Sequence, residues 1–195
     1  FAGYTTYKYN DDGQIASKRN FNDESELTDA TTYKYDSEGK IHSEETRDKN
    51  NEIVSTKEYA YDENGRITNI ITQDANGQVT GQEKTEYLDD GAVETTFLNE
   101  NGEPTKVTVK RDTTIETKYY NENGEVESQN ISEYNENEQK VKETLLDKDG
   151  NNVNIYMYEY NEQGVKITEK IFDSENKLVE ERKFDPTTGE EILED

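Results

Sequence analysis

A nine-residue pattern recurs along this chain at intervals of 26 residues. It reads YKYDSEGKI at 33–41 and YAYDENGRI at 59–67, and related versions begin at Tyr7 (YKYNDDGQI) and Thr85 (TEYLDDGAV). The third position of the pattern is always tyrosine, at 9, 35, 61 and 87. A fixed period of this length predicts an array of similar supersecondary units, each packed against its neighbours.

The pattern itself predicts a β-hairpin. In YDENGRI, Asp62 suits the first position of a type I turn, Asn64 tolerates the third, and Gly65 supplies the left-handed residue of a G1 bulge. This geometry sets Asp62 opposite Arg66 and Tyr61 opposite Ile67. Similar turn signals recur every 11 to 14 residues, so each unit is predicted to contain two strands, with one turn at each edge.

The period slips once, between Gly102 and Tyr119, and then resumes. In this spacer Val107 and Val109 alternate with charged residues, and Asp112 with Thr113 offers a tight turn, which predicts one short hairpin.

Two later turns are predicted to be one residue longer than the others. After Tyr134 and Tyr160 the next aliphatic residues, Val141 and Ile167, follow at a distance of seven rather than six.

The predicted fold is therefore all-β: an antiparallel meander of about 15–16 strands forming an open, twisted and largely single-layer sheet. Hydrophobic residues make up 28% of the chain, against about 45–50% in typical domains. This composition excludes a thick core on both faces. We expect a single repeat domain over residues 1–195, with units near 7–32, 33–58, 59–84, 85–118, 119–144, 145–170 and 171–195.

The segment YAYDENGRI at 59–67 resembles the YD repeat of Rhs and teneurin-type shell proteins, in which Tyr and Asp precede Gly, Arg and an aliphatic residue. The segment YYNENGEV at 119–126 is similar to the hairpins of variant MORN-like repeats in bacterial proteins. The resemblance implies β-hairpin arrays, an extracellular or cell-surface location in an exported bacterial protein, and contact with protein or carbohydrate. It carries over no catalytic residue.

Residues that could support catalysis or metal binding are scattered. The chain has no Cys and a single His, His42, which excludes disulfides, thiolate metal sites and a His-containing catalytic triad with a Cys nucleophile. The DKDGNN segment at 147–152 has its Gly at the fourth rather than the sixth position of a calcium loop, so a hairpin turn is expected. A pair of carboxylates for glycoside hydrolysis would need a pocket that raises one pKa, and the pattern implies none. We expect no enzyme activity, no cofactor and no metal site.

Tyrosine is the one enriched aromatic residue, with 14 copies against five Phe and no Trp. The candidate binding residues are Tyr33, Tyr35, Tyr59, Tyr61 and Tyr87, because tyrosines at i and i+2 share one face of a strand and successive pairs form rows across a sheet. Such a row could stack on sugars or on a partner protein. The alternative is that the tyrosines stabilise the sheet itself, through cross-strand pairs worth about 0.2–1 kcal/mol each.

The formal net charge of −24 bears on partners. It disfavours nucleic acids and anionic membrane surfaces, and no apolar run approaches the roughly 18–20 residues of a membrane-spanning helix. We expect a non-enzymatic extracellular or cell-surface scaffold or spacer that presents a tyrosine-bearing face to a protein or glycan. The alternatives are a carbohydrate-binding module and an acidic binder of a basic protein.

Overall fold

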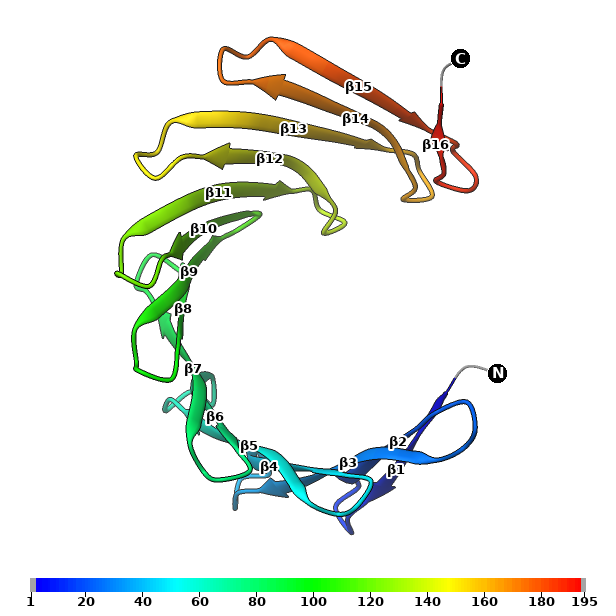
Figure 1. Cartoon of the computed structure of the whole chain (residues 1–195), viewed down its shortest axis with the longest axis vertical. Coiled ribbons are helices and arrows are strands. Elements are labelled where there is room, and N and C mark those ends of the chain that lie inside the picture. Colours follow the sequence, from blue (N-terminus) through cyan, green and yellow to red (C-terminus); the bar gives the residue numbers. More distant parts are fainter. Residues whose placement is uncertain (1–2, 194–195) are drawn as a thin grey trace. The chain divides into compact units, whose positions relative to one another are not determined.

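The computed structural model describes residues 3–193 as 16 β-strands whose order in the sheet follows their order in the chain (Figure 1). All the described pairings are antiparallel, which confirms the predicted open meander of 15–16 strands. No helix occurs among these residues, and hence none that could span a membrane. The strands are β1 (Tyr4–Tyr9), β2 (Ile15–Phe21), β3 (Leu27–Tyr35), β4 (Ile41–Asp48), β5 (Ile53–Tyr61), β6 (Ile67–Asp74), β7 (Val79–Tyr87), β8 (Val93–Leu98), β9 (Pro104–Arg111), β10 (Thr114–Tyr120), β11 (Val126–Tyr134), β12 (Lys140–Leu146), β13 (Asn152–Tyr160), β14 (Lys166–Asp173), β15 (Leu178–Phe184) and β16 (Glu191–Ile192).

The chain divides into two compact units, and each is described by itself below. The first unit comprises Phe1–Thr85 with Phe97–Glu103, and the second comprises Glu86–Thr96 with Pro104–Asp195.

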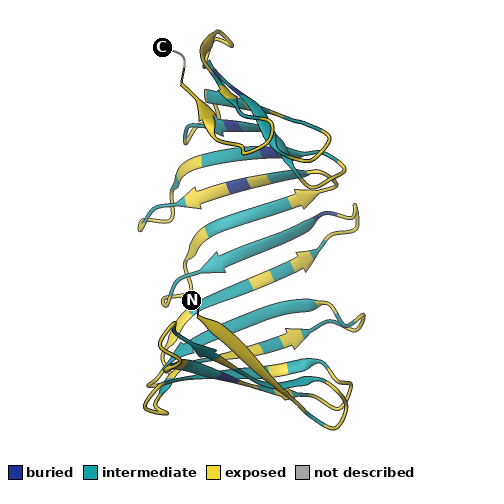
Figure 2. Ribbon diagram, turned by 90° about the vertical axis from the view of Figure 1, so that its right-hand side faces the viewer, coloured by how far each residue is buried: buried dark blue, intermediate teal, exposed yellow. Residues whose placement is uncertain are grey.

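Each unit is largely one layer thick. Within a unit, the strands that contact one another are neighbours in the chain. Ala92 and Ile171 are the buried apolar residues of the described chain, and most of the ribbon is half-buried or exposed (Figure 2). The prediction of a largely single-layer sheet is therefore confirmed, and the cross-strand hydrogen bonds and side-chain pairs must supply most of the stability.

The hairpin between β5 and β6 has the predicted geometry. Tyr61 pairs with Ile67, the Asp62 N–H donates to the Arg66 carbonyl at 2.9 Å, and Gly65 has a φ of 77°. The Asp62 carboxylate explains why Asp or Asn begins such turns, because its Oδ1 accepts the backbone N–H groups of Asn64 (3.0 Å) and Arg66 (2.8 Å). Without that side chain, both N–H groups would lose their protein acceptor.

The prediction of longer turns after Tyr134 and Tyr160 is wrong. Tyr134 pairs with Lys140 and Tyr160 pairs with Lys166, the same six-residue step that joins Tyr61 to Ile67. The turns have the standard length. A lysine occupies the position opposite the tyrosine, and the aliphatic residue that the sequence pattern singled out comes one place later.

The spacer hairpin between β9 and β10 is confirmed, and its turn differs from the others. Thr114 pairs directly with Arg111, which leaves only Asp112 and Thr113 to reverse the chain. Asp112 adopts a φ of 46°. The standard five-residue segment, such as Asp62–Arg66, is therefore shortened to two residues at this one hairpin of the described chain.

Candidate binding surface

Three tyrosines form a row on one face of the first unit, which we call the tyrosine face. Tyr7, Tyr33 and Tyr59 occupy the same position in β1, β3 and β5, 26 residues apart. Glu44 joins the last two, because Tyr33 lies directly opposite Glu44 in the ladder and the Tyr59 hydroxyl donates to Glu44 Oε1 at 2.8 Å. Residues that pair across strands share a face of the sheet, so the row is continuous.

Burial and negative charge favour the protonated form of the Tyr33 and Tyr59 hydroxyls. Partial burial, followed by the nearby Glu44 carboxylate, raises the pKa of Tyr33. Partial burial and the hydrogen bond to Glu44 raise the pKa of Tyr59 further. Tyr33 and Tyr59 are therefore neutral phenols at neutral pH, and the Tyr59 hydroxyl donates its hydrogen bond to Glu44.

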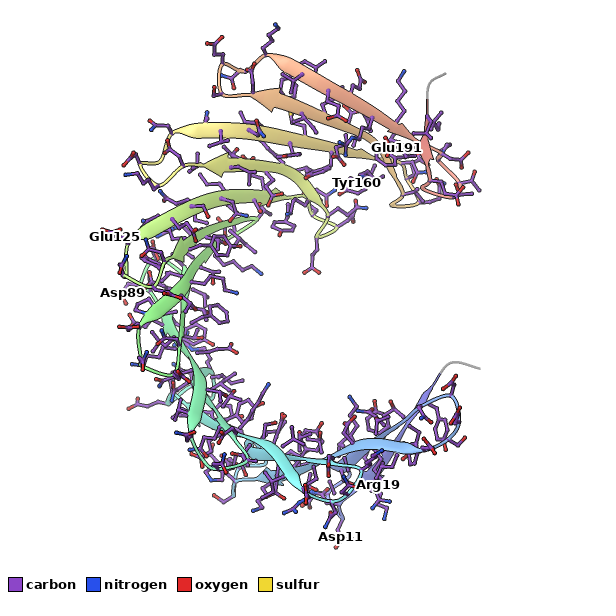
Figure 3. The ribbon with its side chains drawn as sticks, in the orientation of Figure 1. Asp11, Arg19, Asp89, Glu125, Tyr160 and Glu191 are labelled. Atoms are coloured by element: carbon purple, nitrogen blue, oxygen red, sulfur yellow. The ribbon has the colours of Figure 1, made fainter. Side chains whose placement is uncertain are left out.

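The second tyrosine of each pair, which we call the anchor tyrosine, has a different role. The hydroxyl of Tyr35 donates to the Ile15 carbonyl at 2.8 Å, and that of Tyr61 donates to the Ile41 carbonyl at 2.7 Å. Tyr160 (labelled in Figure 3) repeats the bond to the Lys140 carbonyl at 2.8 Å in the second unit. These bonds join one hairpin to the preceding one. The sheet-stabilising interpretation therefore describes the hydroxyls of the anchor tyrosines.

The structure brings together four of the five predicted tyrosines. Tyr33, Tyr35, Tyr59 and Tyr61 share the tyrosine face of the first unit, and Tyr33 and Tyr35 also line an open depression beside the turns at 10–14 and 36–39. Tyr87 ends β7, is half-buried and belongs to the second unit.

Two further residues, Tyr7 and Glu44, belong to this surface and are not among the five tyrosines predicted from the sequence. Tyr7 precedes Tyr33 by one full period, a signal present in the sequence, and is 48% exposed. Glu44, in contrast, follows no motif. Its place between two tyrosines depends on the register of β3, β4 and β5.

In the second unit, carboxylates on the face of Tyr158 are neutralised by nearby cations. Glu169 lies 2.6 Å from Lys166 Nζ and 3.5 Å from Arg182 Nη1, and Glu143 lies 3.0 Å from Lys140 Nζ. Burial, with these two carboxylates, raises the pKa of Tyr158 to about 12. Within residues 3–193, no three His, Cys, Asp or Glu side chains gather in a way that could hold a metal ion.

Comparison with known proteins identifies no family. No protein-family model matches the sequence, and no curated protein is similar to it. Among solved structures, the chain is similar to a porin-like protein from Bacteroides uniformis ATCC 8492, with 13% identity and a TM-score of 0.43, over 96% of this chain and 86% of that chain. It is also similar to a chain of TcdB2-TccC3-Cdc42, with 10% identity and a TM-score of 0.24, over 92% of this chain and 14% of that chain.

Proposed function

We propose that this chain is a non-enzymatic, extracellular or cell-surface scaffold whose tyrosine face binds a protein or glycan partner. The observation that carries the proposal is the row of Tyr7, Tyr33 and Tyr59 on a face that no other strand of the first unit covers. Aromatic rings offer large contact areas with a polar hydroxyl at the edge, a combination suited to both classes of partner.

The three hydroxyls of the row differ in whether they are already hydrogen-bonded. The Tyr59 hydroxyl is occupied by Glu44, whereas those of Tyr7 and Tyr33 have no hydrogen-bond partner among residues 3–193. We therefore assign the binding role to Tyr7 and Tyr33 first. The anchor tyrosines Tyr35 and Tyr61 contribute ring surface while their hydroxyls bond within the sheet.

The resemblance of 59–67 to the YD repeat favours the same type of function, because it implies surface exposure and contact with protein or carbohydrate. The large negative charge makes a cationic protein an alternative partner.

Binding of the whole chain to a glycan array and to an array of purified cationic proteins tests the proposal. We expect Tyr7→Ala with Tyr33→Ala to abolish the signals that the unmodified chain gives. The matched control is Thr6→Ala with Thr32→Ala, because both threonines are exposed and their side chains lie on the face of the sheet opposite the tyrosines. Signals that survive loss of the two tyrosines, or no signal on either array, would contradict the proposal.

A further inference from the structure

A hollow of about 390 Å³ lies in the second unit where the repeat is broken. This volume is within the range of small-molecule sites. Half-buried Ile115 and Tyr134 provide apolar surface, and polar and charged side chains surround them, all exposed except half-buried Asn135. The lining residues are Lys110, Asp112, Thr113, Ile115, Tyr134, Asn135, Glu136 and Glu138.

The short turn between β9 and β10 accounts for the hollow. The neighbouring turn, Asn135–Gln139, has the standard length, whereas Asp112 and Thr113 alone close the hairpin beside it. The two elements remain joined, because the Tyr134 N–H donates to the Thr113 carbonyl at 2.8 Å. Side chains that the longer turn would supply are absent from this place.

Tyr134 occupies the anchor position and lacks the anchor hydrogen bond. In Tyr35, Tyr61 and Tyr160 the hydroxyl donates to the carbonyl of the residue 20 places earlier. The Tyr134 hydroxyl has no hydrogen-bond partner among residues 3–193. Both its ring and its hydroxyl are therefore available to a ligand in the hollow.

In one standard repeat a cation lies over the anchor ring, because Lys40 Nζ is 5.3 Å from the ring centroid of Tyr61. At the same spacing before Tyr35 and Tyr160 the chain has a glutamine, Gln14 and Gln139. Lys40 precedes Tyr61 by 21 residues, and the residue 21 places before Tyr134 is Thr113. The repeat therefore supplies an ammonium group at Tyr61 and a neutral hydroxyl at the equivalent position before Tyr134.

The charges around the hollow favour a cation. Asp112, Glu136 and Glu138 carry negative charge, Lys110 carries positive charge, and none of the four has an ion-pair partner in the described part of the chain. The net charge of the lining is thus negative. An anionic ligand would be repelled, and a neutral ligand would leave the carboxylates without a counter-charge.

We propose that this hollow binds an organic cation carrying an ammonium or guanidinium group. The cation takes the place over the Tyr134 ring that Lys40 takes over Tyr61. Its hydrocarbon part contacts Ile115, and Glu136 and Glu138 provide the counter-charge. Aromatic rings attract such cations within about 6 Å of their centroid, an interaction that changes affinity roughly two- to fivefold at exposed sites. The site is separate from the tyrosine face, so this inference stands without the proposed function.

The cation could come from a free polyamine or from a side chain of a basic protein. Titration of the whole chain with a probe of each kind, monitored by the NMR signals of the backbone amides, distinguishes the two. Spermidine represents a free polyamine, and acetyl-arginine methylamide represents a side chain of a basic protein. We expect saturable shifts at residues around Thr113 and Tyr134, with a dissociation constant on the order of millimolar because the site is open to solvent. The tighter of the two probes identifies the source. Maltose and citrate should give no saturable shift.

Variants with folded spectra then locate the site. Tyr134→Leu, and separately Glu136→Gln with Glu138→Gln, should each weaken the binding roughly two- to fivefold. Thr113→Lys should weaken it similarly, because it places an internal ammonium group at the position that Lys40 has relative to Tyr61. The matched control, Glu162→Gln with Glu175→Gln, removes the same charge from exposed positions in two standard turns of this unit and should change the affinity less than about twofold.

Three results would overturn the proposal. The first is the absence of saturation by either probe at about fifty times the expected millimolar constant. The second is an equal loss of affinity in the control variant, which would show a general response to net charge. The third is unchanged binding in both Tyr134→Leu and Thr113→Lys.

Discussion

The hairpin of β5 and β6 and that of β9 and β10 show what regularity and its interruption do in the same type of sheet. At the first, Tyr61 bonds to the preceding hairpin through its hydroxyl and receives Lys40 over its ring, and Asp62 caps the turn. Beside the second, the equivalent Tyr134 has neither of these side-chain partners.

The difference shows that the standard repeat uses its own polar groups. A thin sheet has few buried apolar residues, so tyrosine hydroxyls bond to the preceding hairpin, and the Asp62 carboxylate bonds to backbone N–H groups and to Arg66 within its own turn. The turn between β9 and β10 is three residues shorter than the standard turn. It therefore provides no partner for the Tyr134 side chain or for the carboxylates of the neighbouring turn. The groups around the hollow that have no partner in the described chain therefore arise from a departure from the repeat.

The largest difference between the two hairpins is expected at their left-handed residues. Gly65 has a φ of 77°, so Gly65→Ala should lower the free energy of unfolding by about 1–2 kcal/mol. Asp112 already holds a φ of 46° with a side chain, so Asp112→Ala should cost no more than about 0.5 kcal/mol. Urea denaturation of both variants measures the difference. Equal losses would show that both turns depend on their left-handed residue to the same degree.

A smaller effect is expected at the two anchor hydroxyls. Tyr61→Phe removes a hydrogen bond of 2.7 Å and should cost about 1 kcal/mol, because the Ile41 carbonyl loses its donor. Tyr134→Phe removes no bond and should leave the free energy of unfolding within about 0.3 kcal/mol of the unmodified chain. The same denaturation experiment compares them. A cost at Tyr134 that matches the cost at Tyr61 would show that its hydroxyl also bonds within the sheet.

Much of the fold was predictable because the turns are encoded locally. Asp62, Asn64 and Gly65 specify a hairpin without reference to the rest of the chain, and the register of Tyr61 with Ile67 follows from it. The error over the turns after Tyr134 and Tyr160 has a local cause as well. The sequence pattern marks the start of the next strand by its first aliphatic residue. Hydrogen bonding sets the turn length instead, and a lysine fits the position opposite the tyrosine as well as an aliphatic residue does.

The binding surfaces were less predictable because they depend on contacts between strands. The 26-residue spacing identified Tyr33 and Tyr59, but their link through Glu44 requires the register of β4. The hollow at Tyr134 had one sequence signal, the slip in the period after Gly102. That slip predicted a short hairpin correctly. Its consequence, an anchor tyrosine without a partner, appears only when the neighbouring turn is placed beside it.

The smallest effect per residue is expected on the stability of single turns as the pH is lowered. Acid should destabilise a turn that begins with Asp and leave one that begins with Asn unchanged. The Arg66 backbone N–H holds the pKa of Asp62 below its ordinary value in the folded chain. The unfolded chain therefore binds more protons in this range. The contribution of Asp62 is complete above the unfolded pKa, about 4, and is lost as the pH falls through the lower folded pKa.

Asn135, beside the hollow, accepts the N–H groups of Asn137 and Gln139 at 3.0 Å with an amide oxygen that does not titrate. Between pH 5 and pH 2, hydrogen-exchange protection should fall at Gly65 before it falls at Glu138, because these amides close the two turns. Asp62→Asn should remove the difference. If protection at both amides is lost at the same pH in the unmodified chain, acid acts on the sheet as a whole. The Asp62 carboxylate would then have no separate role in the stability of its turn.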